Sequence, residues 1–242
     1  QIVTFEWGKS WATNESVVNL FMTRLPATLT VMVPILLLDV LLAIPFAMAV
    51  AAVRGSLTDR ALMVVTTVAL SISFLVYVIV GQYVFAFQLG WFPVQGWSDS
   101  TLTNLLVYTP LPVLLAVMVG LAPQMRLYRT FFLDEIGQDY VRTARAKGMT
   151  ERTILLKHVL RNALIPILTN VAVALPGIFV GSFLIETFFS IPGLGREVLL
   201  AVNRSDYPVI QAVTIYIAVI TMFVNLVTDV LYKLADPRVV LK

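Results

Sequence analysis

The chain has 242 residues, of which 59% are hydrophobic and only 13% are charged, about half the charged share of an ordinary soluble domain. Its formal net charge is +3, and it contains no cysteine and a single histidine, His158. This composition excludes an ordinary soluble domain, disulfide and thiol chemistry, and a metal site built on several histidines.

Several apolar segments are each long enough to cross a bilayer as a helix, which takes about 20 residues. The candidate spans are 27–53, 61–88, 104–123, 163–187 and 209–232. Backbone groups in lipid must be satisfied within the segment, and barrel strands would be shorter and alternating, so these segments predict helices. We therefore expect an all-α membrane protein with an external segment at 1–26 and a transmembrane domain at 27–242.

The cationic residues are distributed unevenly if the spans alternate in direction. Thirteen of the 17 Lys and Arg residues then lie on one side, in 54–60, in 124–162 and in the C-terminal tail. The positive-inside rule makes that side cytoplasmic, so the N-terminus is expected outside and the C-terminus inside. Because no signal peptide is visible, an outside start predicts at least one further span before the first residue, six in all.

Polar and helix-breaking residues inside the spans are candidates for a gate. An ionisable residue within a membrane is costly and often functional, so for Asp39 we expect a structural or gating role in preference to substrate contact, with a polar partner on a neighbouring helix as the simplest case. Pro176 can kink the fourth span, and Gly177 and Gly181 form a pair that favours close helix packing. Glu186 is expected at the level of the headgroups.

The segment 139–166 is charged and lies between two long apolar spans. On a helical wheel its first part places Ala144 and Gly148 on one small-residue arc, with cationic residues on both flanks. Gly148 is a natural helix stop, and Thr150 is a good N-cap for a second helix that leads into the membrane. We interpret the first helix as a docking site for a soluble partner. The alternative is an amphipathic helix that contacts anionic headgroups.

Enzymatic activity is not expected. Gly8-Lys9-Ser10 superficially suggests a phosphate loop, but the required first glycine is Val3 and no strand precedes it. No set of residues suited to catalysis or metal binding is visible, and His158 is expected to serve packing or an interface. A secondary transporter would show internal repeats and several midplane charges, and the sequence shows one such charge.

Several motifs resemble the ABC-importer permeases, specifically the peptide branch that includes oligopeptide, dipeptide and nickel permeases. The run RTARAKG at 142–148 is similar to the cytoplasmic coupling loop of that branch. Further matches, in chain order, are Arg24–Leu29, Ile191–Gly195, Asn203–Pro208, Asn225-Leu226, Asp229, Tyr232 and Asp236-Pro237-Arg238.

The resemblance implies the transmembrane domain of a type I ABC importer in a bacterial cytoplasmic membrane. It implies a path for peptides formed with a second homologous permease, an external binding protein that delivers the peptide, and two ATPase subunits that hold ATP and Mg, while this chain holds no cofactor or metal and binds no nucleic acid. A nickel-chelate importer is the alternative within the family, and a channel or secondary transporter the alternative outside it.

The resemblance also assigns residues to these roles. The coupling helix at 139–148, within the loop 124–162, is implied to contact the ATPase through Asp139, Tyr140, Arg142, Thr143, Ala144, Arg145, Lys147 and Gly148. Contact with the binding protein is implied for Ile191, Pro192, Gly193, Leu194, Gly195, Asp206 and Tyr207.

Overall fold

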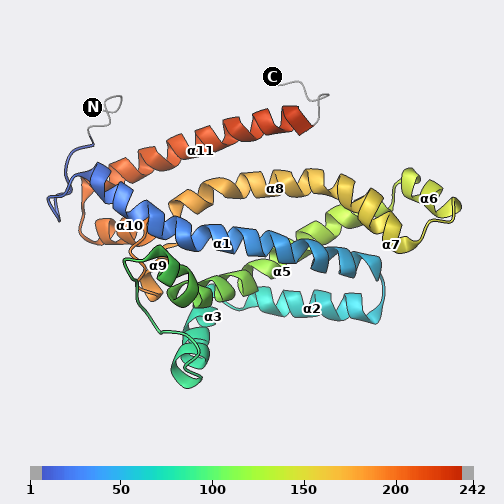
Figure 1. Ribbon diagram of the computed structural model, residues 1–242, viewed down its shortest axis with the longest axis horizontal. Helices are drawn as coiled ribbons and strands as arrows, with labels where there is room; N and C mark the ends of the chain where they lie inside the picture. Colours follow the sequence, from blue (N-terminus) through green and yellow to red (C-terminus); the bar gives the residue numbers. More distant parts are fainter. Residues whose placement is uncertain (1–6, 236–242) are drawn as a thin grey trace. The chain divides into compact units, whose positions relative to one another are not determined.

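A computed structural model describes residues 7–235, with side chains to Thr228 (Figure 1). Within this range the chain forms helices and no strand, apart from one isolated antiparallel bridge between Lys9 and Ser16. The elements are α1 (Val17–Ala52), α2 (Leu57–Ser71), α3 (Phe74–Gly81), η1 (Gln82–Gln88), α4 (Thr101–Thr103), η2 (Asn104–Tyr108), α5 (Pro110–Ile136), α6 (Asp139–Ala146), α7 (Glu151–Thr153), η3 (Ile154–Val159), α8 (Leu160–Val180), α9 (Phe183–Phe188), α10 (Leu194–Asn203) and α11 (Tyr207–Ala235); those marked η are π-helical.

The membrane class predicted from the apolar segments is confirmed. Among the described residues, four helical stretches are long and apolar enough to cross a bilayer: Val17–Ala52, Pro110–Ile136, Glu151–Phe188 and Tyr207–Thr228. Their bounds differ from the predicted ones. Helix α1 begins within the segment expected to be external, and α5 extends to Ile136, so the first part of the predicted loop 124–162 continues a membrane helix.

The second predicted span, 61–88, is not one straight helix. Helices α2 and the α3–η1 pair meet at a bend of 88° and count as a fifth span only if taken together. The break falls at Ile72, whose extended backbone (ψ 129°) ends the helical ladder. Near this end Ser71 Oγ donates to Thr67 O (2.9 Å), and the Tyr77 hydroxyl donates to Ala69 O (3.0 Å), which also accepts the Ile72 N–H (3.3 Å). These bonds make the break tolerable in an apolar stretch.

The chain divides into two compact units. Unit 1 contains Gln1–Pro34, Val78–Leu114 and Ala172–Lys242, and unit 2 contains Ile35–Tyr77 and Leu115–Val171. Helices α1, α5 and α8 each contribute residues to both units.

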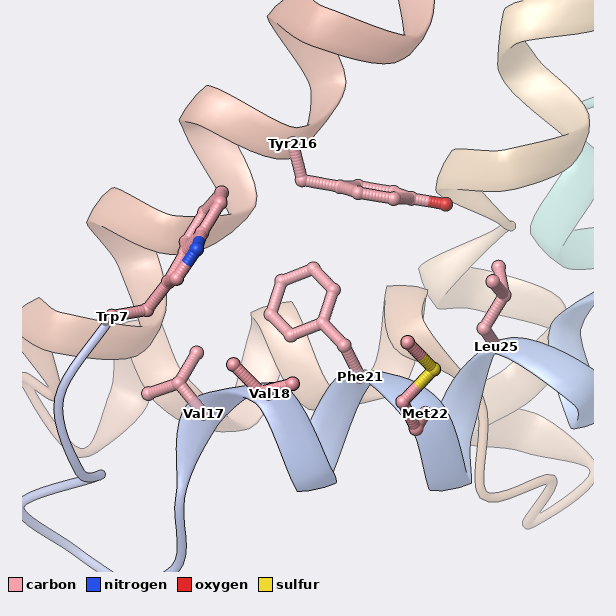
Figure 2. Close-up of a pocket in the computed structure, with 7 residues that line it drawn as sticks. All are labelled: Trp7, Val17, Val18, Phe21, Met22, Leu25 and Tyr216. Atoms are coloured by element: carbon pink, nitrogen blue, oxygen red, sulfur yellow. The ribbon is translucent and has the colours of Figure 1, made fainter. Parts of the chain in front are cut away.

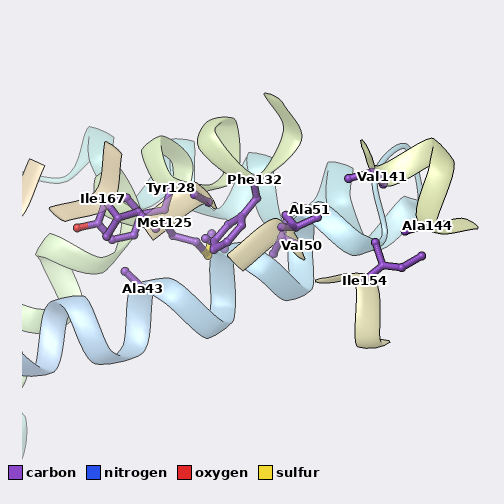
Figure 3. Packing of buried hydrophobic residues seen from close by; sticks show 13 residues of the cluster. Ala43, Val50, Ala51, Met125, Tyr128, Phe132, Val141, Ala144, Ile154 and Ile167 are labelled. Atoms are coloured by element: carbon purple, nitrogen blue, oxygen red, sulfur yellow. The ribbon is translucent and has the colours of Figure 1, made fainter. Parts of the chain in front are cut away.

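The core of unit 2 joins α1, α5, α6 and the start of α8 (Figure 3). Ala43, Ala47 and Ala51 recur at four-residue spacing along α1 and are at most 2% exposed. Such small side chains let neighbouring helices approach closely. Larger side chains fill the opposite positions; they are Met125, Tyr128, Phe132, Val141, Ile154, Val159 and Ile167. The buried face of α6, which carries Val141 and Ala144, is thus part of this core.

A buried ion pair also holds unit 2 together. Asp59, in the first turn of α2, accepts hydrogen bonds from Arg129 Nε (3.0 Å) and Nη2 (2.8 Å) and from the backbone N–H of Gly55 (2.9 Å). The side chains of Asp59 and Arg129 are 7% and 16% exposed. The bidentate geometry fixes the start of α2 against the last third of α5.

Unit 1 has its own small core. Val17 and Leu20 of α1 pack against Ala201 of α10 and against α11 through Val209, Ala212 and Val213. This packing brings the N-terminal part of the chain to the α10–α11 region. It forms the frame for the motifs at 191–195 and 203–208 described below.

Candidate functional site

The turn after α6 has the chemistry that its sequence predicts. Gly148 adopts φ +73°, in the left-handed region that favours glycine, and its N–H donates to Arg145 O (2.9 Å). Thr150 then caps α7, because its hydroxyl accepts the N–H of Thr153 (3.4 Å). The predicted helix stop and the predicted N-cap are both confirmed, and together they set the sharp reversal between α6 and α7.

One face of α6 is anchored inside unit 2. Val141 and Ala144 are 0% and 6% exposed and belong to the same core as Ile154 (Figure 3). The Tyr140 hydroxyl donates to Glu135 Oε2 (2.5 Å). Burial and this hydrogen bond raise the pKa of Tyr140, so its hydroxyl stays protonated. The small side chain at Ala144 therefore serves internal packing, and close approach of a partner to the backbone there is not available.

The other face of α6 is exposed and cationic. Arg142, Thr143, Arg145 and Lys147 all lie on the surface. Arg142 pairs with Asp139 (3.1 Å), and Arg145 forms two bonds with Glu151 across the turn (2.7 and 3.2 Å). The second pair connects α6 to α7 across the turn. The exposed face of α6 thus carries Arg142, Thr143, Arg145 and Lys147, which are among the residues implied to contact the ATPase, whereas Ala144 lies on the buried face.

In unit 1, Glu186 is buried within the protein at 1% exposure. Its expected position at headgroup level stays a prediction. Its carboxylate accepts hydrogen bonds from Thr28 Oγ1 (2.9 Å) and from the N–H of Arg196 (2.8 Å). Thr28 Oγ1 in turn accepts the N–H of Leu194 (2.8 Å). These partners come from α1 and from the start of α10, which explains how a carboxylate is accommodated there.

Three glycines make room for this carboxylate. A Cβ on Gly181 or Gly193 would run into the Glu186 carboxyl, and one on Gly195 would lie 2.8 Å from Phe183 N. Gly181 has φ +78° and ends α8, whereas a Cβ on Gly177 would meet nothing within 4 Å. Thr28 of α1 approaches Gly181, where a Cβ would lie 2.7 Å from its Cγ2, whereas no described residue approaches Gly177. Close helix packing on the Gly177–Gly181 pair stays a prediction. The α8 helix continues through Pro176.

The motif at 191–195 is mostly a buried scaffold. Ile191, Gly193, Leu194 and Gly195 are buried, whereas Pro192 is partly exposed. Four of these five implied contacts with a binding protein therefore do not reach the surface. The fold uses them to hold Glu186 and the start of α10.

Asp206 is also engaged within the chain. It accepts hydrogen bonds from the Ser10 hydroxyl and from the N–H groups of Trp11 (3.1 Å) and Ala12 (3.3 Å), and it is 3% exposed. Burial raises the pKa of Asp206, but these hydrogen bonds outweigh it and hold the pKa below its usual value. Its neighbour Tyr207 is 57% exposed. Of the residues implied for external contact, Tyr207 and Pro192 are the ones on the surface.

Asp39 lies on α1 in unit 2 and is partly buried. Its Oδ1 is sealed from solvent and has no hydrogen-bond partner among the described residues, so the expected polar partner is not found there. A Cβ on Gly120 would lie 3.0 Å from Asp39 Oδ2, so this glycine of α5 gives the carboxylate its space. A gating role for Asp39 stays a prediction.

Unit 1 contains an apolar pocket of about 180 Å³ between α1 and α11 (Figure 2). Its lining consists of Trp7, Val17, Val18, Phe21, Met22, Leu25 and Tyr216. The Phe21 ring meets the Tyr216 ring edge-on at 5.2 Å, and the Tyr216 hydroxyl donates to Phe179 O (3.4 Å). A pocket with this lining lacks the convergent polar groups that orient a polar ligand, so it is not a candidate for binding one.

Sequence reasoning did not predict the ion pair of Asp59 or the burial of Glu186. A signal existed for Glu186, because three glycines near it in sequence, at 181, 193 and 195, indicate close approach to a backbone or side chain. Near Asp59 the sequence showed the N-cap residue Ser56. Arg129, the ion-pair partner of Asp59, lies 70 residues away. His158, which was expected to serve packing or an interface, is partly buried in η3.

The helices and their arrangement define an all-α, multi-pass membrane protein with a short charged helix between two spans. Residues 43–241 match the family described as binding-protein-dependent transport system inner membrane component. The chain belongs to this family of ABC-importer permeases, and its fold is the type I importer transmembrane domain.

Similar proteins with assigned names cover most of the chain. The oligopeptide transport system permease protein AppB of Bacillus subtilis (strain 168) is 35% identical over 91% of this chain and 71% of its own length. The di/tripeptide transport system permease protein DppB of Pseudomonas aeruginosa (strain UCBPP-PA14) is 33% identical over 96% and 76%. The dipeptide transport system permease protein DppB of Lactococcus lactis subsp. cremoris (strain MG1363) is 34% identical over 94% and 73%.

Proposed function

We propose that this chain is a permease subunit that forms half of the translocation path of an ATP-driven peptide importer. The relatives named above are permeases of oligopeptide, dipeptide or tripeptide transport systems, which supports a peptide as the transported solute. Their names give no support to nickel-chelate import. The second half of the path belongs to a homologous permease in this proposal.

The observation that carries the proposal is the two-faced α6 helix. Its inner face is held by Val141 and Ala144 in the core of unit 2, and its outer face presents exposed cationic side chains. A lever of this kind needs a rigid base and a free contact surface, and α6 has both. In the proposed mechanism, ATPase subunits that hold ATP and Mg contact the outer face. Their closure moves α6, and the motion passes through η3 into α8.

The remaining partner is an external binding protein that delivers the peptide. Pro192 and Tyr207 are the exposed members of the two outer motifs, so we assign the contact to them. The buried members of these motifs hold the contact surface in shape. In this proposal the chain itself does not hydrolyse ATP. The free energy of ATP hydrolysis on the ATPase subunits reaches it through the movement of α6.

The coupling role is tested by reversing charge on the exposed face of α6. We expect Arg142→Glu combined with Lys147→Glu to reduce co-purification of the ATPase subunits by at least about tenfold, because like charges placed against a complementary surface cost several kcal/mol. The measurement is the ratio of ATPase to permease in affinity-purified complexes, with membrane insertion checked in parallel.

The matched control is the double variant Arg60→Glu, Arg152→Glu. Both residues are exposed, lie in unit 2 and are outside α6, and the change in net charge is the same. It is expected to retain the ATPase subunits. Equal retention in both double variants would exclude α6 as the contact surface.

We also propose that the protein lies in a bacterial cytoplasmic membrane with α6 and the C-terminus on the cytoplasmic side. The chain has no native cysteine, so single cysteines report sidedness directly. In intact cells, an impermeant maleimide is expected to label Arg204→Cys and to leave Lys147→Cys unlabelled until the membrane is opened. Both positions are exposed. The reverse pattern of labelling would invert the proposed topology.

A further inference from the structure

A basic pocket lies where η3 meets α8. It has a volume of about 390 Å³ and is lined by Lys157, His158, Arg161 and Asn162. The lining contains two permanent cations and one imidazole but no carboxylate. Among the described residues, neither Lys157 nor Arg161 forms an ion pair. This is an electrostatic environment suited to an anion.

Lys157 and Arg161 lie on the exposed side of this segment. Ile154, Val159, Ala163 and Ile167 form the side of η3 and α8 that is buried in unit 2, each at 0% exposure. The basic residues are exposed or partly exposed. They recur at four-residue spacing, as Lys157–Arg161 and His158–Asn162, which places them near one another on the outward side.

One polar atom in this set has no partner inside the protein. His158 Nε2 is sealed from solvent and makes no hydrogen bond with any residue that the structure describes. A buried polar nitrogen without a partner costs free energy. Because protein atoms cover Nε2, it offers no contact to a ligand in the pocket, and the charge of the site comes from Lys157 and Arg161.

The outward side of α8 then becomes apolar. Ile165 and Leu168 follow Arg161 at four and seven residues, on the same face of the helix, and are 58% and 56% exposed. This segment is within the apolar stretch Glu151–Phe188 that is long enough to cross a bilayer. Large exposed apolar side chains on such a helix face acyl chains, so Arg161 lies where the apolar surface gives way to a polar one.

We propose that this pocket binds the phosphate of an anionic phospholipid headgroup, with the acyl chains lying along Ile165 and Leu168. Lys157 and Arg161 supply the charge that selects an anionic lipid. The exposed apolar face on α8 favours a lipid over free phosphate, since free phosphate has no group to cover it. The assignment stands on this pocket alone and does not require that α6 bind an ATPase.

The site is also connected to the base of α6. The Asn162 side chain interacts with the Tyr140 hydroxyl, which donates to Glu135. A headgroup in the pocket would therefore contact Asn162, which interacts with Tyr140 of α6. Lipid composition is expected to modulate the movement of that helix.

The test uses the whole importer complex reconstituted in nanodiscs of phosphatidylcholine containing about one third phosphatidylglycerol. Native mass spectrometry after detergent release counts the phosphatidylglycerol that stays bound. We expect Lys157→Gln combined with Arg161→Gln to lower its apparent affinity roughly 30-fold, from about 1 kcal/mol per basic side chain near anionic lipid and 1.4 kcal/mol per tenfold. The control Arg60→Gln, Arg152→Gln removes the same charge from exposed positions and is expected to retain the lipid.

Three outcomes would overturn the proposal. The first is equal retention in the two double variants. The second is displacement of the lipid by millimolar inorganic phosphate, which would show that the pocket binds a free anion. The third is loss of the ATPase subunits from the pocket variant, which would make the pocket part of a subunit interface. Failure of the α6 charge reversal with lipid binding intact would refute the coupling role and leave the lipid site standing.

Discussion

Replacing Arg129 with alanine is expected to destabilise unit 2 by about 3–5 kcal/mol, the range found when one partner of a buried ion pair is removed. The variant leaves the Asp59 carboxylate, 7% exposed, with the Gly55 N–H and the attraction of Arg54 but without its bidentate partner. A charge compensated so weakly in that position disfavours the folded state. The start of α2 and the last third of α5 should therefore lose their mutual constraint.

The measurement is hydrogen exchange of the amides of α2 and α5 in the reconstituted complex, together with unfolding in a detergent titration. Arg126→Ala serves as the matched control, because Arg126 lies on the same helix, is only partly buried and forms no ion pair in the part of the chain that the structure describes. Arg129→Lys keeps the charge but loses the bidentate geometry, so it should fall between the two. If Arg129→Ala and Arg126→Ala proved equally mild, the ion pair would not anchor α2.

The second large effect is expected in unit 1. Glu186→Ala removes the acceptor for the partly buried Arg196 N–H and for the buried Thr28 hydroxyl. Each buried group left without a partner costs about 1–3 kcal/mol, so we expect a loss of about 2–5 kcal/mol. The cavity left beside Gly181, Gly193 and Gly195 adds to the cost, because glycines cannot fill it.

Tryptophan fluorescence during detergent-induced unfolding reports on this change, since the tryptophans of the chain, at 7, 11, 91 and 97, lie in unit 1. Glu186→Gln keeps the volume and one carbonyl acceptor and should be milder. Glu15→Ala removes an exposed carboxylate from the same unit and should change stability little. Fluorescence transitions of Glu186→Ala and Glu15→Ala that coincide would contradict a structural role for the buried carboxylate.

Transport assays distinguish the Glu186→Ala variant from the Arg129→Ala variant. The Glu186 network holds the motif at 191–195, which supports the surface proposed for the external partner. Peptide uptake by the Glu186→Ala variant should therefore decrease, because the surface proposed to contact the external binding protein is perturbed. This decrease is expected even under conditions in which the ATPase subunits still co-purify. Arg129→Ala acts on unit 2, which carries α6, so its defect should appear in ATPase retention as well.

Local features of the chain were predictable from the sequence. The apolar segments predicted membrane helices because the cost of transferring side chains into lipid is close to a sum over neighbouring residues. The reversal after α6 followed from Gly148 and Thr150, since a left-handed backbone and an N-cap are each decided by a few adjacent atoms. The resemblance carried by 142–148 and 191–195 pointed to the permease family for the same reason, as it rests on short motifs.

Features that depend on distant partners were not predictable in the same way. The burial of Glu186 was not predicted, because Thr28, 158 residues away in sequence, supplies a hydrogen bond that makes burial possible. Ala144 seemed to open α6 to a partner, but the fold turns it into the core beside Ile154. The break at Ile72 depends in part on the Tyr77 hydroxyl, which donates a hydrogen bond to Ala69 O near the end of α2.

The sequence by itself determined that the chain is a helical membrane protein, where most of its spans lie, and which short segment carries charge between them. The tertiary structure decided which side of α6 is free, which carboxylates are buried and what satisfies them. The division has a physical cause: hydropathy and turn chemistry are set by residues adjacent along the chain, whereas burial and the pairing of polar groups are set by residues that only folding brings together.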